Sequence, residues 1–156
     1  EMAQLVTTFV KVILDKINTG DNQKKHDKLK WFQGEYALAV DTAYGVGGVT
    51  LTEILQQCTD VLDSLPEMVN LQQSESDTQK MNHKSGAEYV QKGQSFPCDA
   101  PKERTVYASF DGDADRLVFS YSPDISTKAF RLIDGDKIAI LFALFVNDQL
   151  KKLNLK

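Results

Sequence analysis

The sequence predicts an α/β fold in which helices cover a mixed sheet, and three observations support this prediction. Short apolar runs of strand length alternate with longer runs of helical periodicity. Turns rich in glycine, proline and aspartate separate these runs. The chain has 156 residues, of which 42% are hydrophobic and 26% charged, and this is enough to bury the core of one globular domain.

The N-terminal segment predicts an amphipathic helix from Met2 to Asn18. Apolar residues recur there at steps of three and four, and they are Val6, Phe9, Val10, Ile13 and Ile17. Polar residues then continue to Lys30, which predicts a loop without evident chemistry. His26 lies in this loop and has no acidic or cysteine partner at ligand spacing, so we interpret it as a solvated side chain.

A buried strand, a tight turn and a helix are predicted next. The run Tyr36 to Asp41 is short and apolar, and the turn Thr42 to Gly48 leads into a helical pattern that stops at Pro66. A dinucleotide site is a weak alternative, because Thr50 stands where a G-x-G-x-x-G motif requires its third glycine. We therefore interpret the glycines as a tight connection between strand and helix.

The middle of the chain predicts a second strand at Glu67 to Gln72 and a polar surface loop at Gln73 to Lys80. The following segment, His83 to Val90, is short, and Gly86 and Ala87 indicate a helical turn within it. We interpret His83 as a structural residue.

Three further strands and a helix are predicted in the C-terminal part. The strands are Val106 to Phe110, Leu117 to Tyr121 and Phe130 to Ile133, and the helix is Lys137 to Lys152. Asp134 and Asp136 precede this helix, and we expect them to cap it and to complement its dipole. The helix contains the most apolar run, Ile138 to Val146, which is too short to span a bilayer and predicts a buried helix.

The loop between the first two of these strands holds three carboxylates at alternate positions. Asp111, Asp113 and Asp115 are separated only by single small residues, and Arg116 alone cannot neutralise them. A surface turn gains nothing from three mutually repelling acids. Because every donor is a hard carboxylate oxygen, the loop predicts a site for Mg²⁺, Mn²⁺ or Ca²⁺.

Two known loop types can be tested against this pattern. An EF-hand requires Gly at its sixth position and Glu at its twelfth, but counting from Asp111 these are Arg116 and Ser122. A phosphatase of the haloacid dehalogenase type, with Asp111 or Asp113 as nucleophile, lacks the expected Gly and Thr or Val after its D-x-D. That phosphatase stays open as an alternative, as does a non-catalytic cation-binding module.

The segment F-D-G-D-A-D-R, residues 110–116, resembles the metal-binding loop of the α-D-phosphohexomutases. The flanking segments L-I-D-G-D-K-I-A, residues 132–139, and M-N-H-K-S-G-A-E-Y-V, residues 81–90, are similar to those of phosphoacetylglucosamine mutases. The turn after the first strand resembles the family's V-D-x-A-x-G-x-G. Compared with the family's C-G-A-D, Ser85 replaces Cys and Glu88 replaces Asp, which leaves the side-chain roles there open.

This resemblance implies a three-layer α/β/α sandwich with a mixed, mostly parallel sheet, of the phosphohexomutase domain 2 type. It implies Mg²⁺, with Mn²⁺ as the alternative ion, at Asp111, Asp113 and Asp115, and Arg116 as the catalytic residue that faces the phosphoserine and the substrate phosphate. The expected reaction interconverts N-acetylglucosamine 6-phosphate and 1-phosphate and feeds UDP-N-acetylglucosamine synthesis.

The resemblance also implies that residues 1–156 are a single domain of a larger enzyme. No T-A-S-H-N phosphoserine segment, E-x-S-G-H sugar-binding loop or terminal phosphate-binding domain occurs in the sequence. The expected partners are those missing domains and the sugar phosphate. We therefore expect the chain alone to be inactive.

Charge and cysteine content bear on the expected binding partners and on the cellular location. The net charge of −4, without a basic stripe, argues against nucleic-acid binding, and no apolar run predicts a membrane partner. Cys58 and Cys98 match no metal-ligand or redox spacing, which favours a reducing, cytoplasmic location. The N-terminus has no secretory signal pattern.

Overall fold

The computed structural model describes residues 37–59, 62, 64–101, 106–124, 126–127 and 129–153. The predicted helix from Met2 to Asn18 and the polar loop to Lys30 lie outside the described residues. The elements, in chain order, are β1 Leu38–Asp41, α2 Val46–Gln56, β2 Glu67–Val69, the 3-10 helix η1 Glu75–Lys80, α3 Gly86–Gly93, β3 Val106–Phe110, β4 Leu117–Tyr121, β5 Arg131–Ile133 and α4 Gly135–Lys152.

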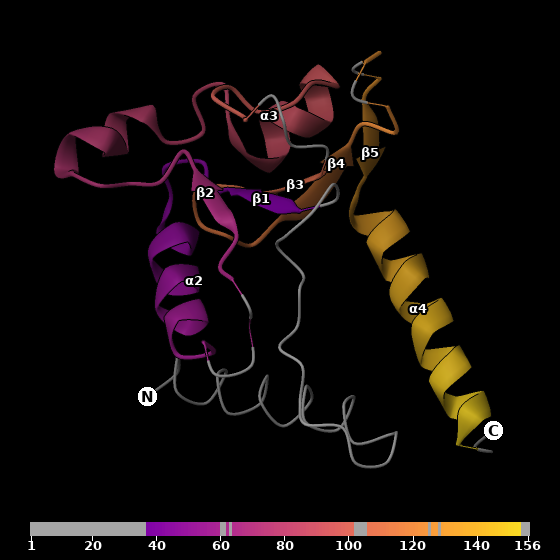
Figure 1. Cartoon of the computed structure of the whole chain (residues 1–156). Coiled ribbons are helices and arrows are strands. Elements are labelled where there is room, and N and C mark those ends of the chain that lie inside the picture. The colour runs from indigo at the N-terminus through magenta and orange to yellow at the C-terminus, as the bar shows by residue number, and fades with distance from the viewer. Residues whose placement is uncertain are drawn as a thin grey trace.

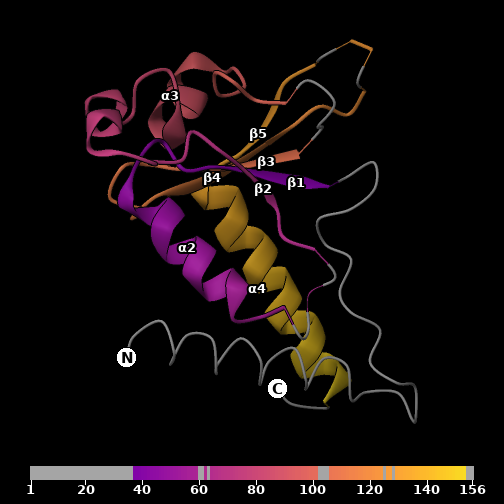
Figure 2. The same cartoon turned by 60° about the vertical axis from the view of Figure 1, so that its left-hand side comes forward.

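One five-stranded sheet in the order β2-β1-β3-β4-β5 organises these elements. Strand β1 runs parallel to β2 and β3, whereas β3 and β4, and then β4 and β5, pair antiparallel. Helix α3 lies on one face of the sheet, and α2 and α4 lie on the other (Figure 1, Figure 2). The predicted α/β fold with a mixed sheet is therefore confirmed. Its strand pairings divide evenly between parallel and antiparallel, because the short acidic loop joins β3 and β4 as a hairpin.

The apolar core lies between the sheet and α3. Ala87 and Val90 on α3 pack with Val118 on β4, and all three side chains are buried. Buried and half-buried residues alternate along β4, as the two faces of a strand require. Helix α3 is thus fixed directly above the two strands that flank the acidic loop.

Several predicted boundaries differ in the structure. Strand β2 ends at Val69 rather than Gln72, β5 begins at Arg131 rather than Phe130, and α4 begins at Gly135 rather than Lys137. Helix α2 ends at Gln56 rather than continuing to Pro66. The predicted polar loop Gln73 to Lys80 contains the 3-10 helix η1. Asp77 explains this turn, because its carboxylate accepts hydrogen bonds from the backbone N–H groups of Gln73 and Ser74 and so caps the start of η1.

The prediction that Ile138 to Val146 forms a buried helix is wrong with respect to burial. The segment lies in helix α4, which is not buried. The helix starts at the edge strand β5 and runs away from the sheet (Figure 1, Figure 2), and none of its residues is buried. Its large exposed apolar residues are Ile140, Leu141, Phe142, Leu144, Phe145, Val146 and Leu150. The apolar composition of a helix does not specify the surface that covers it. Within the described part of the chain, no helix is both long and apolar enough to cross a membrane.

The start of α4 agrees with the sequence. The Asp134 carboxylate accepts a hydrogen bond from the Lys137 backbone N–H at 3.2 Å, so Asp134 is the N-cap, as predicted. Asp136 lies in the first turn, where its negative charge complements the helix dipole.

Candidate metal centre

The acidic loop connects β3 to β4 and begins at the carboxyl end of β3. Asp111 directly follows this strand and is buried, whereas Asp113 and Asp115 are exposed. One carboxylate oxygen from each of the three lies within 4.8 Å of the others. Ala114 holds the turn in the left-handed conformation, with φ of 60°, and its N–H donates to the Asp111 carbonyl. The structure therefore brings all three predicted ligands to one point.

Arg116 folds back onto the first of these carboxylates. Its backbone N–H donates to Asp111 Oδ1 at 3.1 Å, and its Nε donates to Oδ2 at 2.5 Å. Burial raises the pKa of Asp111, but the hydrogen bonds and charge of Arg116 outweigh it and keep this pKa below its usual value. Asp111 is thus held as a carboxylate at neutral pH.

The repulsion among the three carboxylates affects Asp115. The negative charges of Asp113 and then of Asp111 raise the pKa of Asp115, while the Arg116 Nε lies 3.8 Å from Asp115 Oδ1 and only partly offsets them. A divalent cation would remove this repulsion. Three converging hard oxygen donors, two of them open to solvent, suit Mg²⁺, which keeps waters in its shell.

The glycine-rich turn after β1 packs directly against the acidic loop. The Val46 N–H donates to the Gly112 carbonyl at 3.0 Å. A Cβ added to Gly45 would lie 2.6 Å from Gly112 Cα, and one added to Gly47 would lie 2.8 Å from Ala114 Cβ. The predicted tight connection is correct. Its glycines also let the backbone touch the acidic loop, a role that the sequence did not reveal.

The segment before α3, with Met81 and Asn82, packs against Gly112 of the acidic loop. A Cβ added to Gly112 would lie 2.5 Å from Met81 Sδ and 2.9 Å from Asn82 Nδ2. The Asn82 N–H in turn donates to the Ala43 carbonyl at 3.0 Å. Gly112 is therefore enclosed by two segments that are distant in sequence, and both restrict the position of Asp111 and Asp113.

A buried carboxylate joins these supporting segments. Asp41 ends β1 and is fully buried. Its Oδ1 accepts from the Ala43 N–H at 3.1 Å and from Asn70 Nδ2 at 2.9 Å, and its Oδ2 accepts from the Gly86 N–H at 2.7 Å. Burial raises the pKa of Asp41, although these hydrogen bonds partly oppose the rise. The start of α3 is thereby tied to β1 and to the residue that follows β2.

Helix α3 contributes a second carboxylate to Arg116. Glu88 Oε2 accepts from Arg116 Nη2 at 3.3 Å, and Glu88 Oε1 accepts from Lys92 Nζ at 2.5 Å. These bonds, first that of Lys92 and then that of Arg116, lower the pKa of Glu88. The spacing of Glu88 and Lys92 at i and i+4 predicts their ion pair, but nothing in the sequence places Arg116 beside them.

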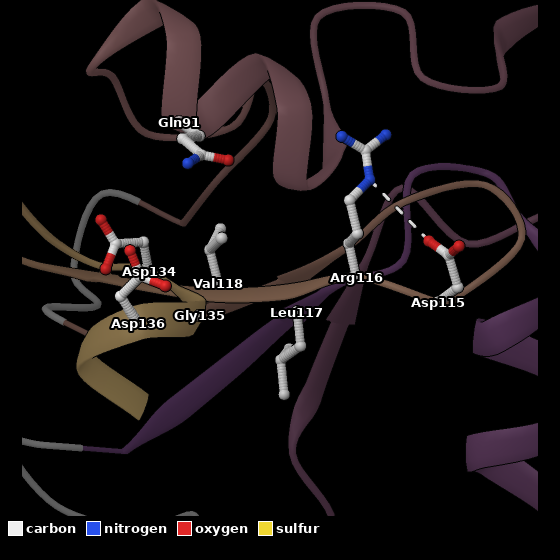
Figure 3. Close-up of a pocket in the computed structure, with 8 residues that line it drawn as sticks. All are labelled: Gln91, Asp115, Arg116, Leu117, Val118, Asp134, Gly135 and Asp136. Atoms are coloured by element: carbon white, nitrogen blue, oxygen red, sulfur yellow. Dashed lines mark ion pairs between the residues drawn. The ribbon is translucent and has the colours of Figure 1, made fainter. Parts of the chain in front are cut away.

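An open cavity of about 380 Å³ lies beside the acidic loop. Arg116 and Asp115 lie at one end of it, and Asp134 and Asp136, at the start of α4, lie at the other (Figure 3). Of the predicted carboxylates, Asp115, Asp134 and Asp136 line this cavity. Within the described residues only Asp111, Asp113 and Asp115 form a cluster of metal-ligand geometry.

The chain matches the family model for domain II of phosphoacetylglucosamine mutase AMG1 over residues 25–118. It is 39% identical to the phosphoacetylglucosamine mutase of Saccharomyces cerevisiae over 122 residues, which is 76% of this chain and 21% of the yeast protein. It is 37% identical to that of Arabidopsis thaliana over 150 residues, which is 95% of this chain and 24% of the plant protein.

A solved structure shares the fold. It is the Aspergillus fumigatus N-acetylphosphoglucosamine mutase in complex with GlcNAc-6P and magnesium, with a TM-score of 0.60 and 34% identity. The similarity covers 73% of this chain and 22% of the fungal one. The chain thus spans about a fifth to a quarter of the length of the proteins that it matches.

Proposed function

The chain belongs to the family of domain II of phosphoacetylglucosamine mutase AMG1, and we propose that residues 1–156 are the metal-binding domain of such a mutase. The observation that carries this proposal is the cluster of Asp111, Asp113 and Asp115 on one loop, with Arg116 beside it. The whole protein would interconvert N-acetylglucosamine 6-phosphate and 1-phosphate through a phosphoserine on another domain. Its product would feed UDP-N-acetylglucosamine synthesis.

The division of labour within the domain follows from phosphoryl transfer, which depends on positioning and electrostatic stabilisation. The three aspartates would hold Mg²⁺, or Mn²⁺ in its place, and the bound ion would neutralise charge on the transferring phosphoryl group. The magnesium in the fungal relative's structure supports this assignment. The planar guanidinium of Arg116 would hold the phosphate through paired N–H groups.

The haloacid dehalogenase alternative receives less support from the site. Both oxygens of Asp111 accept hydrogen bonds from Arg116, and the pKa of this carboxyl is lowered. A carboxylate stabilised in this way is a weaker nucleophile, and this argument applies to Asp111 and not to Asp113. Cys58 and Cys98 match no metal-ligand or redox spacing, and this supports the proposal of a reducing, cytoplasmic location.

The proposal is tested in the full-length enzyme with the triple variant D111N/D113N/D115N and with Glu53→Gln, which changes an exposed carboxylate of α2, as a control outside the cluster. We expect the triple variant to lose Mg²⁺ binding in calorimetric titration and to lose roughly hundredfold or more in kcat/KM, because the electrostatic stabilisation is removed. The control should keep both. Equal Mg²⁺ affinity in the triple variant would refute the metal centre, and an aspartyl phosphate trapped on this chain would instead identify a phosphatase.

A further inference from the structure

The guanidinium of Arg116 lies between two carboxylates that come from different elements. Asp111, at the end of β3, accepts from Nε at 2.5 Å, and Glu88, in the first turn of α3, accepts from Nη2 at 3.3 Å. The Arg116 side chain extends toward the helix that carries Gln91, which is α3 (Figure 3). Its orientation is therefore set from both sides.

These two contacts occupy one edge of the guanidinium, and a second edge stays available for a ligand. Nε and Nη2 form the side edge of the planar group, and two of its five N–H donors are used there, which leaves three on Nη1 and Nη2. Nη1 and Nη2 together form the end of the fork, the edge that can pair with two oxygens of one phosphate. Glu88 and Asp111 thus leave the phosphate-binding edge available.

Glu88 is itself held in place. Lys92, one turn further along α3, donates to its second oxygen at 2.5 Å. The start of α3 is fixed two residues earlier, where the buried Asp41 accepts from the Gly86 N–H at 2.7 Å. The ion pair with Lys92 also offsets the negative charge of Glu88, so that this carboxylate repels an approaching phosphate less.

We propose that Glu88 is a positioning residue that aims the end of the Arg116 guanidinium at a phosphate monoester dianion. This inference rests on the proposed mutase function, in which that dianion is the substrate phosphate or the phosphoserine. The Glu88 and Arg116 side chains are about half exposed, at 47% and 51%, so their ion pair contributes little to the stability of the fold. The ion pair acts on the orientation of the Arg116 guanidinium, and therefore on the rate of phosphoryl transfer.

A double-mutant cycle in the full-length enzyme tests the proposal, with Glu88→Gln, Arg116→Lys and the double variant. We expect Glu88→Gln to lower kcat/KM for N-acetylglucosamine 6-phosphate by about tenfold. This lies between the few-fold effect of an exposed ion pair and the hundredfold effect of a displacement of about 1 Å. In the Arg116→Lys background the same change should cost less than about twofold, because Glu88 acts through Arg116. Mg²⁺ affinity should be unchanged.

Two controls complete the experiment. Glu88→Asp keeps a carboxylate and should retain most of the activity, and Glu53→Gln removes an exposed carboxylate from α2 and should have no effect. Equal losses from Glu88→Gln in both backgrounds, or no loss in either, would overturn the positioning role. Absence of mutase activity in the wild-type full-length enzyme would instead refute the proposed function, so the two failures can be distinguished.

Discussion

Gly45 and Gly112 are the residues at which the β1 turn and the acidic loop touch. A Cβ on Gly45 would lie 2.6 Å from Gly112 Cα, which is backbone, whereas a Cβ on Gly112 would meet the end of the flexible Met81 side chain at 2.5 Å. We therefore expect Gly45→Ala to lower the free energy of unfolding by about 1 to 3 kcal/mol, as overpacking does. Gly112→Ala should cost less, because Met81 can move.

Urea unfolding of both variants measures this difference, and Mg²⁺ titration measures its effect on the acidic loop. Gly45→Ala should also weaken Mg²⁺ binding, because it pushes on the residue between Asp111 and Asp113. Gly93→Ala is a suitable control, since its added Cβ meets only Ser95 Oγ, at 3.1 Å. An equal free energy of unfolding for Gly45→Ala and the wild type would show that the two loops are not in close contact.

The sequence predicts the residues of this site to different degrees. Asp111, Asp113 and Asp115 could be identified because adjacent loop positions are close in space in any fold. Glu88 and Asp41 could not be assigned to the site in this way. Their relation to Arg116 and Gly86 depends on α3 crossing the sheet above β3 and β4, and that is a tertiary contact between segments 28 and 45 residues apart.

Helix α4 is the element whose environment differs most from its composition. Phe142 and Phe145 are 67% and 55% exposed. We expect Phe142→Ser and Phe145→Ser each to change the free energy of unfolding of this chain by less than about 0.5 kcal/mol, as exposed substitutions do. Serine and phenylalanine also have similar helix propensities.

The matched comparison is a residue of the core. Val90 on α3 is fully buried, and Val90→Ala should cost about 1.5 kcal/mol or more in the same urea unfolding experiment. A loss of about 3 to 5 kcal/mol in either phenylalanine variant is the value for a buried ring. Such a result would contradict the exposed position of α4.

The 3-10 helix η1 gives a stability that depends on pH. Asp77 accepts hydrogen bonds from Lys80, Gln73 and Ser74, and these lower its pKa to about 2. The pKa of an aspartate carboxyl is about 3.9 in an unfolded chain. Because the folded pKa is the lower one, the stabilisation is complete above pH ~4 and is lost as the pH falls toward 2.

Asp77→Asn removes this titration. We expect the wild type to have the higher Tm at pH 5, and the gap between the two proteins to close progressively between pH ~4 and 2. Thermal unfolding followed by circular dichroism at pH 5, 4, 3 and 2 measures the gap. A gap that stays constant over this range would mean that Asp77 does not keep its charge in the folded state.

The elements themselves were largely predictable, and the two failures have different causes. Strands β3 and β4 begin and end where the sequence indicates, because alternation and the acidic turn both mark them. The η1 turn was missed because a capping box of Ser74 and Asp77, rather than apolar periodicity, produces it. The exposure of α4 was missed because periodicity reports which face is apolar and not what covers it.

At the scale of the whole molecule, the domain presents its ligands at one edge of the sheet. The acidic loop, the β1 turn and the start of α3 meet there. Buried hydrogen bonds of Asp41 connect the end of β1 to Asn70 and to Gly86 at the start of α3, and the Val46 N–H joins the β1 turn to the acidic loop at the Gly112 carbonyl. This arrangement can hold an ion and orient a guanidinium. The described part of the chain shows no second group placed to donate a phosphoryl group to a sugar.

We therefore expect this chain alone to fold but not to interconvert N-acetylglucosamine 6-phosphate and 1-phosphate. The acidic loop can stabilise charge, yet the chain spans only 21% and 24% of the yeast and plant mutases that it resembles. Correct positioning of donor and acceptor contributes about 7 to 11 kcal/mol to lowering such a barrier, and a metal loop by itself cannot supply it. Phosphorus NMR of the purified chain with Mg²⁺, substrate and a sugar bisphosphate measures both isomers, with D111N/D113N/D115N as the control. Conversion by the chain that the control lacks would show that one domain suffices for the reaction.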